Sequence, residues 1–122
     1  MRRMVAALAV VLLSAVTLTA CGGGSSSTKG GDLPTKKIAI TIKGSDTDPS
    51  GQKIDVAVGQ KIELDVTADK PGEIHVHSSP EEQEFEYKAG SSTFDVKPVP
   101  APGQVTVESH TLDKVLFTLV AR

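Results

Sequence analysis

The chain contains very little cysteine and few aromatic residues. Among its 122 residues there are one cysteine, Cys21, one tyrosine, three phenylalanines and no tryptophan. A single cysteine excludes an intrachain disulfide, so a small domain must be held together by a hydrophobic core or by a bound metal. With so few aromatic side chains, that core must be built from isoleucine, valine and leucine, which suit pleated sheets. The composition therefore favours an all-β protein.

Positive charge is not in excess either. The formal net charge is -2, and it becomes -4 when Arg2 and Arg3 are left out. Nucleic acids and anionic lipid surfaces attract basic proteins. Neither is therefore expected as an electrostatic partner, whereas protein contacts and metal binding remain open.

Long hydrophobic runs are absent except near the N-terminus. Residues 4–16 are mostly apolar and follow Arg2 and Arg3, which is the pattern of a signal peptide rather than of a membrane span. The run leads to Leu-Thr-Ala-Cys at residues 18–21, and the Gly-Gly-Gly-Ser-Ser-Ser of residues 22–27 cannot continue a helix. The alternative, a buried N-terminal helix in which Cys21 merely packs, does not account for this linker.

Residues 18–21 resemble the lipobox of bacterial lipoprotein signal peptides. The resemblance implies that Cys21 receives a diacylglycerol and that the chain is cut before it. Acyl chains such as palmitate would then anchor the protein to the outer face of the cytoplasmic membrane. The expected organisation is a signal peptide at residues 1–20, a lipidated cysteine with a flexible linker at residues 21–34 and one domain at residues 35–122.

The domain shows the two-residue alternation of β-strands. Strands are predicted around residues 36–43, 54–58, 62–66, 74–77, 94–96, 105–107 and 115–119, with a turn-rich loop at residues 44–51 and a short edge strand or loop at residues 81–87. The last strand is apolar on nearly both faces and is expected inside a sheet. Seven or eight short strands without a helical stretch indicate an antiparallel β-sandwich or barrel.

Three histidines carry the metal-binding potential of the domain. His75 and His77 are two residues apart, so a strand sends both to the face opposite the core. By the same parity, Glu108 and His110 leave the core side of their own strand. If the two strands are neighbours, these four side chains converge, and three imidazoles suit copper or zinc.

Other interpretations of these polar residues stay open. Histidines on an outer face are commonly solvated or cap a loop, and they also form pH-responsive contacts. The acidic run at residues 81–86 is interpreted as a solvated face rather than a cation site. Asp46 and Asp48 lack the closing glutamate of a calcium loop. A zinc hydrolase would need a pocket and a general base, which the sequence does not show, so we expect no enzyme.

Residues 52–122 resemble the cupredoxin-like domains of small bacterial, especially actinobacterial, lipoproteins. The resemblance rests on residues 58–62, residues 68–77 with their Pro-Gly-Glu-Ile-His-Val-His, and residues 102–110 before an apolar last strand. It implies a Greek-key β-sandwich. In blue-copper members, the strand after the glycine that matches Gly103 ends in a cysteine ligand, and histidine and methionine ligands follow. Here Ser109 takes the cysteine's place, His110 follows, and no methionine lies downstream.

The sequence thus predicts a monomeric, lipid-anchored, non-enzymatic cupredoxin-like domain that lacks the blue-copper thiolate. It would bind or deliver copper or zinc through His75, His77 and His110, with Glu108 as a fourth ligand or a supporting group. The alternative is an interaction module for an envelope or transport protein, in which residues 81–86 or a strand edge form the contact and the histidines are incidental.

Overall fold

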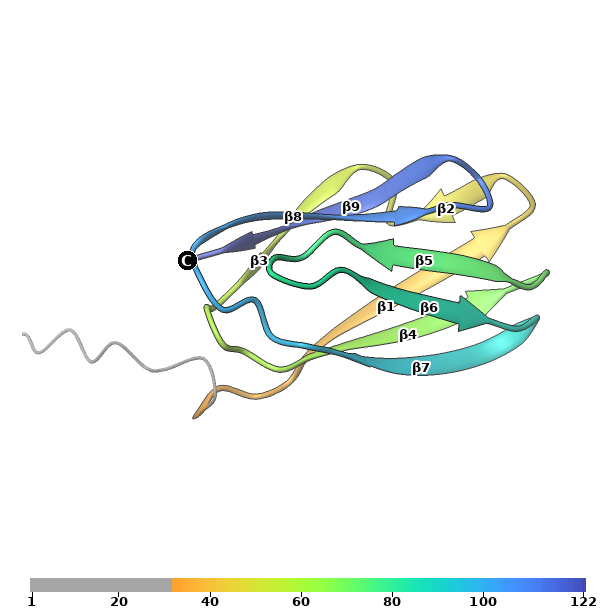
Figure 1. Cartoon of the computed structure of the whole chain (residues 1–122). Helices are drawn as coiled ribbons and strands as arrows, with labels where there is room; N and C mark the ends of the chain where they lie inside the picture. Colours follow the sequence, from red (N-terminus) through yellow and green to blue (C-terminus); the bar gives the residue numbers. More distant parts are fainter. Residues whose placement is uncertain (1–31) are drawn as a thin grey trace, which may run out of the picture.

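A computed structural model describes residues 32–122 (Figure 1). The expected signal peptide, Cys21 and the linker as far as residue 31 lie outside the described residues. The described residues form two β-sheets that face each other. No helix among them is long and apolar enough to cross a membrane.

Residues 32–122 contain nine strands. They are β1 (Lys36–Lys43), β2 (Asp46–Asp48), β3 (Gln52–Val56), β4 (Ile62–Ala68), β5 (Gly72–Val76), β6 (Gln83–Tyr87), β7 (Gly90–Val96), β8 (Gly103–Ser109) and β9 (Lys114–Ala121). One sheet has the order β2-β1-β4-β7, and the other has the order β3-β9-β8-β5-β6. The predicted all-β sandwich is confirmed, with one strand more than the seven or eight expected.

The additional strand is β2, which lies in the segment predicted to be a loop. It is only three residues long and pairs with the end of β1, where Asp48 stands opposite Thr41. Its residues are polar and typical of turns, so they do not show the alternating apolar positions that indicate a strand. At residues 81–87 the edge-strand alternative is the correct one, because β6 pairs only with β5 at the rim of its sheet.

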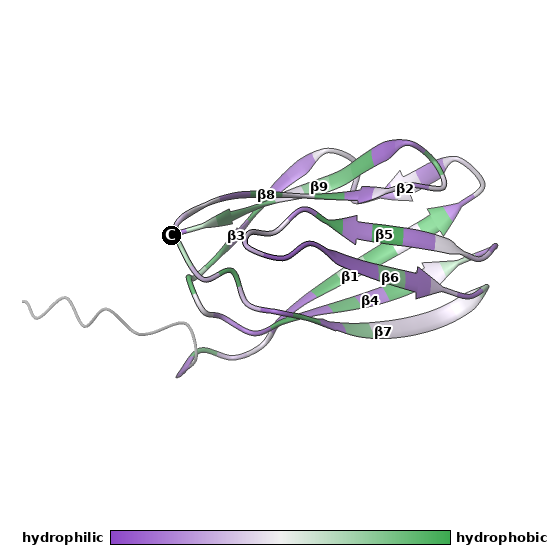
Figure 2. Cartoon of the chain, viewed as in Figure 1, coloured by the Kyte–Doolittle hydropathy of each residue, from purple (hydrophilic) through white to green (hydrophobic). Residues whose placement is uncertain are grey.

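The core lies between the sheets and is largely aliphatic, and Figure 2 shows apolar segments on strands of both sheets. In β1, Ile38, Ile40 and Ile42 are 5%, 0% and 3% exposed, as their alternation predicts. Burial of one such side chain contributes roughly 1.5–3 kcal/mol. Because residues 32–122 contain no cysteine, this core and not a disulfide holds the two sheets together.

The turn after β3 joins two strands that belong to different sheets. β3 pairs in parallel with β9, and β4 pairs in parallel with β1. The chain crosses at Gly59, which has a φ of +77° and donates a 2.9 Å backbone hydrogen bond to the carbonyl of Val99. Glycine adopts such a φ without steric cost. The sandwich therefore contains two parallel pairs beside its antiparallel ones, whereas an antiparallel sandwich was expected. Alternation could not show this, because it indicates the face of a residue and not its neighbouring strand.

A β-bulge in β9 changes which of its side chains face the core. Val107 pairs with Phe117 and Glu108 pairs with Val115, so Leu116 has no partner in the ladder. Leu116 and Phe117 are both fully buried although they are consecutive, and Val115 is 43% exposed. The extra residue breaks the two-residue period. The alternation of Val115 with Phe117 therefore does not hold, but β9 does lie inside its sheet, between β3 and β8.

Candidate metal centre

The predicted ligands lie on, or directly after, two neighbouring strands of the five-stranded sheet, with His77 one residue past β5 and His110 one residue past β8. β5 and β8 pair antiparallel, and His75 stands opposite Glu108. Ile74 and Val76 of β5 point into the core, with exposures of 0% and 1%, so His75 between them points to the outer face. The two strands are thus neighbours, as the convergence of the histidines requires.

Four side chains bring one potential ligand atom each to a common region. These atoms all lie within 4.8 Å of one another, and we call their residues, His75, His77, Glu108 and His110, the His–Glu cluster. Nδ1 of His75 lies 2.9 Å from Nε2 of His110. Oε1 of Glu108 lies 2.7 Å from Nε2 of His77 and 3.2 Å from Nε2 of His110. The structure therefore brings together all four residues that the sequence singles out.

The cluster is partly buried although it lies on the face opposite the core. His75 is only 6% exposed, and the ring centroids of His77 and His110 lie 4.2 Å and 4.6 Å from its own. His77 and Glu108 are half-buried, and His110 is exposed. Solvated surface histidines would stand apart from one another, whereas here one imidazole lies beneath two others. This arrangement favours a binding site that is open on the side of His110.

Two further carboxylates contact the outer nitrogens of these rings. Oε1 of Glu73 lies 3.1 Å from Nδ1 of His110. Glu82 reaches two rings, with Oε1 3.2 Å from Nδ1 of His77 and Oε2 3.1 Å from Nε2 of His75. Nε2 of His75 is buried and makes no hydrogen bond of good geometry, so this last contact is electrostatic rather than directional.

Glu73 and Glu82 are two site residues that are not among those predicted from the sequence. Glu73 could have been predicted, because it lies two residues before His75 and therefore points to the same face of the sheet. Glu82 lies in the loop between β5 and β6, where strand periodicity gives no information about direction. Glu84, which stands opposite His75 on β6, is farther away, with Oε1 4.0 Å from Nε2 of His75.

Charge pairing inside the site shifts three pKa values. The pKa of His77 is raised, first by its hydrogen bond to Glu108 and then by its hydrogen bond to Glu82. The hydrogen bond to His77 in turn lowers the pKa of Glu108 and that of Glu82. An opposite charge within hydrogen-bond distance favours the ionised form of each partner. In the metal-free protein, the two carboxylates at its two ring nitrogens therefore favour the protonated form of His77.

The other polar residues considered in the sequence do not join the cluster. Ser109, which takes the place of a blue-copper cysteine, is fully buried, and its Oγ has no hydrogen-bond partner. It faces the core, because Glu108 and His110 on either side point outward. Glu81 forms an ion pair with Lys97. Asp46 and Asp48 lie in β2, in the other sheet.

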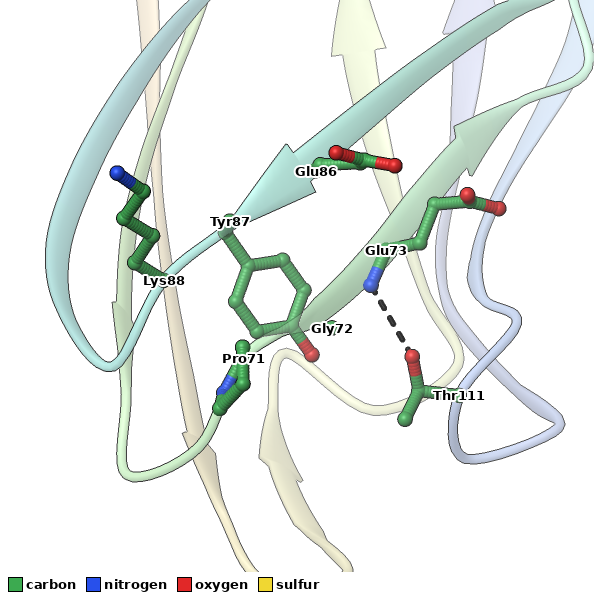
Figure 3. A pocket seen from close by; sticks show the side chains of 7 residues that line it. All are labelled: Pro71, Gly72, Glu73, Glu86, Tyr87, Lys88 and Thr111. Atoms are coloured by element: carbon green, nitrogen blue, oxygen red, sulfur yellow. Dashed lines mark hydrogen bonds between the residues drawn. The ribbon is translucent and has the colours of Figure 1, made fainter.

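A cavity of about 470 Å³ lies beside the cluster and is lined by Glu73, which contacts His110. Figure 3 shows the ring of Tyr87 against Gly72 and a hydrogen bond from the backbone N–H of Glu73 to Oγ1 of Thr111, which is 3.1 Å long. The carboxylate of Glu73 points away from the Tyr87 ring in this view. Thr111 directly follows His110, so this hydrogen bond ties the end of the β8 segment to the start of β5.

No protein-family model and no curated protein matches this sequence. Solved structures do match. Auracyanin A, a "blue" copper protein from Chloroflexus aurantiacus, has a TM-score of 0.54 and 12% identity over 73% of this chain and 100% of that chain. Reduced auracyanin from Roseiflexus castenholzii has a TM-score of 0.53 and 13% identity over 71% and 97%, respectively.

A copper(I) amicyanin variant has a TM-score of 0.51 and 10% identity over 78% of this chain and 90% of that chain. The fold is cupredoxin-like. At these low identities the likeness concerns the fold alone, so the chemistry of the site must be argued from this chain's own side chains.

Those side chains do not fit a blue-copper centre. Residues 32–122 contain no cysteine and no methionine, and a blue-copper site needs a thiolate and usually a weak thioether. Three imidazoles and one carboxylate instead suit a borderline divalent ion such as copper(II) or zinc. The cupredoxin-like sandwich thus carries a different set of potential ligands on the outer face of its five-stranded sheet.

Proposed function

We propose that this chain is a membrane-anchored extracytoplasmic lipoprotein whose cupredoxin-like domain binds copper(II) or zinc at the His–Glu cluster. It holds or delivers the ion and catalyses no reaction. The observation that carries the proposal is the convergence of three imidazoles and one carboxylate, whose ligand atoms lie within 4.8 Å of one another.

The spacing of these atoms supports the proposal. Metal–nitrogen bonds of about 2.0–2.1 Å place the ligands of a tetrahedral ion about 3.3 Å apart. Three of the separations within the cluster are 2.7, 2.9 and 3.2 Å, and none exceeds 4.8 Å. Binding would therefore need outward shifts of about 0.6 Å or less between the close pairs and inward shifts of at most about 1.5 Å between the others. Two of the side chains are half-buried and one is exposed.

The charge of the surroundings supports a cation in particular. Glu73 and Glu82 lie outside the histidines, and no lysine or arginine is paired with either carboxylate within the described residues. A divalent ion on three neutral imidazoles and Glu108 would carry one residual positive charge, which these two carboxylates can offset. The same negative field would raise the local concentration of cations near the site.

The membrane anchor rests on the sequence. Residues 18–21 and the apolar segment before them support lipidation of Cys21, and the linker that follows would let the domain reach away from the bilayer. Cells grown with radiolabelled palmitate should label the wild-type chain and not Cys21→Ser. Equal labelling of both chains would refute lipidation at this residue.

Metal binding is tested by calorimetry on the full chain in detergent, with Cys21→Ser so that the thiol cannot bind the ion. We expect one zinc or copper(II) ion per chain and a strong loss of affinity in His75→Ala and His110→Ala. Glu86→Gln is the matched control, because it removes a carboxylate from the same sheet without a contact to the cluster. Binding weaker than about 10 µM, equivalent to about -7 kcal/mol, or binding unchanged in both alanine variants, would refute the proposal.

One observation favours an interaction module as the second candidate. β6 is the edge strand of its sheet, its backbone is paired on one side only, and it carries Glu84 and Glu86 on its exposed positions. A partner strand that carries lysine or arginine would suit this edge. Crosslinking of the same envelope protein to the wild-type chain and to the triple histidine-to-alanine variant would support this candidate, and loss of the crosslink in the triple variant would exclude it.

A further inference from the structure

Each histidine of the cluster faces the shared centre with one ring nitrogen and a carboxylate with the other. For His110, Nε2 faces inward, 2.9 Å from Nδ1 of His75, and Nδ1 faces Glu73 at 3.1 Å. For His77, Nε2 faces Glu108 at 2.7 Å and Nδ1 faces Glu82 at 3.2 Å. His75 is turned the other way, with Nδ1 inward and Nε2 toward Glu82 at 3.1 Å.

Glu82 contacts two rings at once because these rings stand side by side. The ring centroids of His75 and His77 are 4.2 Å apart with an interplanar angle of 35°. The carboxylate lies across both, and each of its oxygens contacts one ring. Oε1 forms a hydrogen bond with Nδ1 of His77, whereas Oε2 contacts Nε2 of His75 electrostatically. A carboxylate has two acceptor oxygens that share its negative charge, whereas an amide in its place has one neutral acceptor oxygen.

The loop that carries Glu82 is held by its own hydrogen bonds. Oγ of Ser78 donates to the carbonyl of Glu81 at 2.6 Å and accepts from Nε2 of Gln83 at 3.1 Å. The backbone N–H of Lys97 donates to Oε1 of Gln83 at 2.8 Å, which ties the loop to the residue after β7. The side chain of Glu82 is 59% exposed, so neighbouring side chains do little to fix its position. Its position beside the histidines is therefore set by the backbone of the loop.

Glu73 is fixed in a different way. It lies on β5 with the same parity as His75 and His77, and its backbone N–H donates to Oγ1 of Thr111, the residue after His110 (Figure 3). This hydrogen bond joins the two segments that provide the carboxylate and its imidazole. A hydrogen bond between the backbone of Glu73 and the side chain of Thr111 thus supports the contact between Glu73 and His110.

We propose that Glu73 and Glu82 are positioning residues that select the ligating nitrogen of each histidine, Nδ1 for His75 and Nε2 for His77 and His110. The inference rests on the proposed metal binding. A neutral imidazole carries one hydrogen, and a carboxylate beside one ring nitrogen favours the hydrogen on that nitrogen, by a hydrogen bond at His77 and by its negative charge at His75 and His110. The lone pair is then left on the opposite nitrogen. Outer carboxylates of this kind also raise ligand basicity, and their loss typically costs 10- to 100-fold in metal affinity.

The experiment uses the full chain with Cys21→Ser, labelled with ¹⁵N at histidine and titrated with zinc chloride. Zinc affinity is measured for Glu82→Gln and Glu73→Gln, and the imidazole ¹⁵N shifts identify the nitrogen that binds zinc in each ring. The matched controls are Glu81→Gln and Glu86→Gln, which remove the same charge from neighbouring positions without touching an imidazole.

We expect Glu82→Gln and Glu73→Gln to lower zinc affinity by about 10- to 100-fold and the controls to change it by less than about 3-fold, the remote electrostatic effect alone. In the unsubstituted site, zinc should bind Nδ1 of His75 and Nε2 of the other two rings. Glu82→Asp should recover part of the lost affinity, because it keeps both acceptor oxygens.

Two results would overturn the inference and leave metal binding intact. One is tight zinc binding by the unsubstituted chain that Glu82→Gln weakens no more than the control Glu81→Gln does. The other is ligation through Nε2 by all three histidines. Failure of the unsubstituted chain to bind zinc or copper(II) would instead overturn the proposed function, and the inference would fall with it.

Discussion

Gly72 is the position where the structure leaves no room for a side chain. A Cβ atom there would lie 2.6 Å from Cζ of Tyr87 and 2.8 Å from Oγ1 of Thr111. Carbon atoms pack best at about 3.5–4.0 Å, so the tyrosine ring would have to move by roughly 1 Å. Tyr87 is only 3% exposed and packs in the core, which leaves it little freedom to move.

The substitution Gly72→Ala should therefore destabilise the metal-free domain by about 1–3 kcal/mol, the usual cost of overpacking. For a domain of this size the thermal midpoint should fall by roughly 5–20 °C, as measured by circular dichroism. The double variant Gly72→Ala/Tyr87→Phe should recover part of the loss, because it removes the atom that meets the new methyl group most closely. A midpoint within about 1 °C of the wild type would refute this account of the close approach.

Three further predictions concern the site and the strand beside it. The raised pKa of His77 means that its stabilising charge is fully present below about pH 6.5 and is lost as the pH rises through the folded-state pKa. Urea midpoints of the metal-free protein should accordingly fall between pH 6 and pH 9, and less so in Glu108→Gln; a flat profile would contradict the pairing. Ser109→Ala should raise stability by about 1 kcal/mol in urea unfolding, because it removes a buried hydroxyl without a partner, and a loss of that size would show that the hydroxyl is bonded. Ser109→Cys in the Cys21→Ser chain should give no intense visible thiolate-to-copper absorption with copper(II), because residue 109 faces the core; appearance of that band would place it at the cluster.

Much of the sandwich follows from two-residue alternation. The repeated Ile of β1 and the Val pair of β8 point inward as predicted, because a buried face needs apolar side chains at every second position. His75 and Glu108 point outward for the same reason, as predicted. Alternation fails at Leu116, where a bulge adds a residue, and nothing in the local composition marks that insertion.

Strand neighbours and loop directions are less visible in a sequence. The parallel pairs β1–β4 and β3–β9 depend on where the chain crosses between the sheets. A glycine at residue 59 indicates a turn there, but it does not indicate which sheet the next strand joins. The four cluster residues could be selected because strand parity relates them in pairs. Glu82 could not, because its direction is set by hydrogen bonds of Ser78 and Gln83 in an irregular loop.

X-ray absorption of the zinc-loaded chain tests the central claim most directly, again with Cys21→Ser so that no cysteine sulfur is present. The account predicts four nitrogen or oxygen ligands at about 2.0–2.1 Å, with the multiple-scattering signature of about three imidazoles and no sulfur shell. His110→Ala should lose one imidazole from that signature. An all-oxygen shell without imidazole, or a spectrum that His110→Ala leaves unchanged, would contradict a metal centre at the His–Glu cluster.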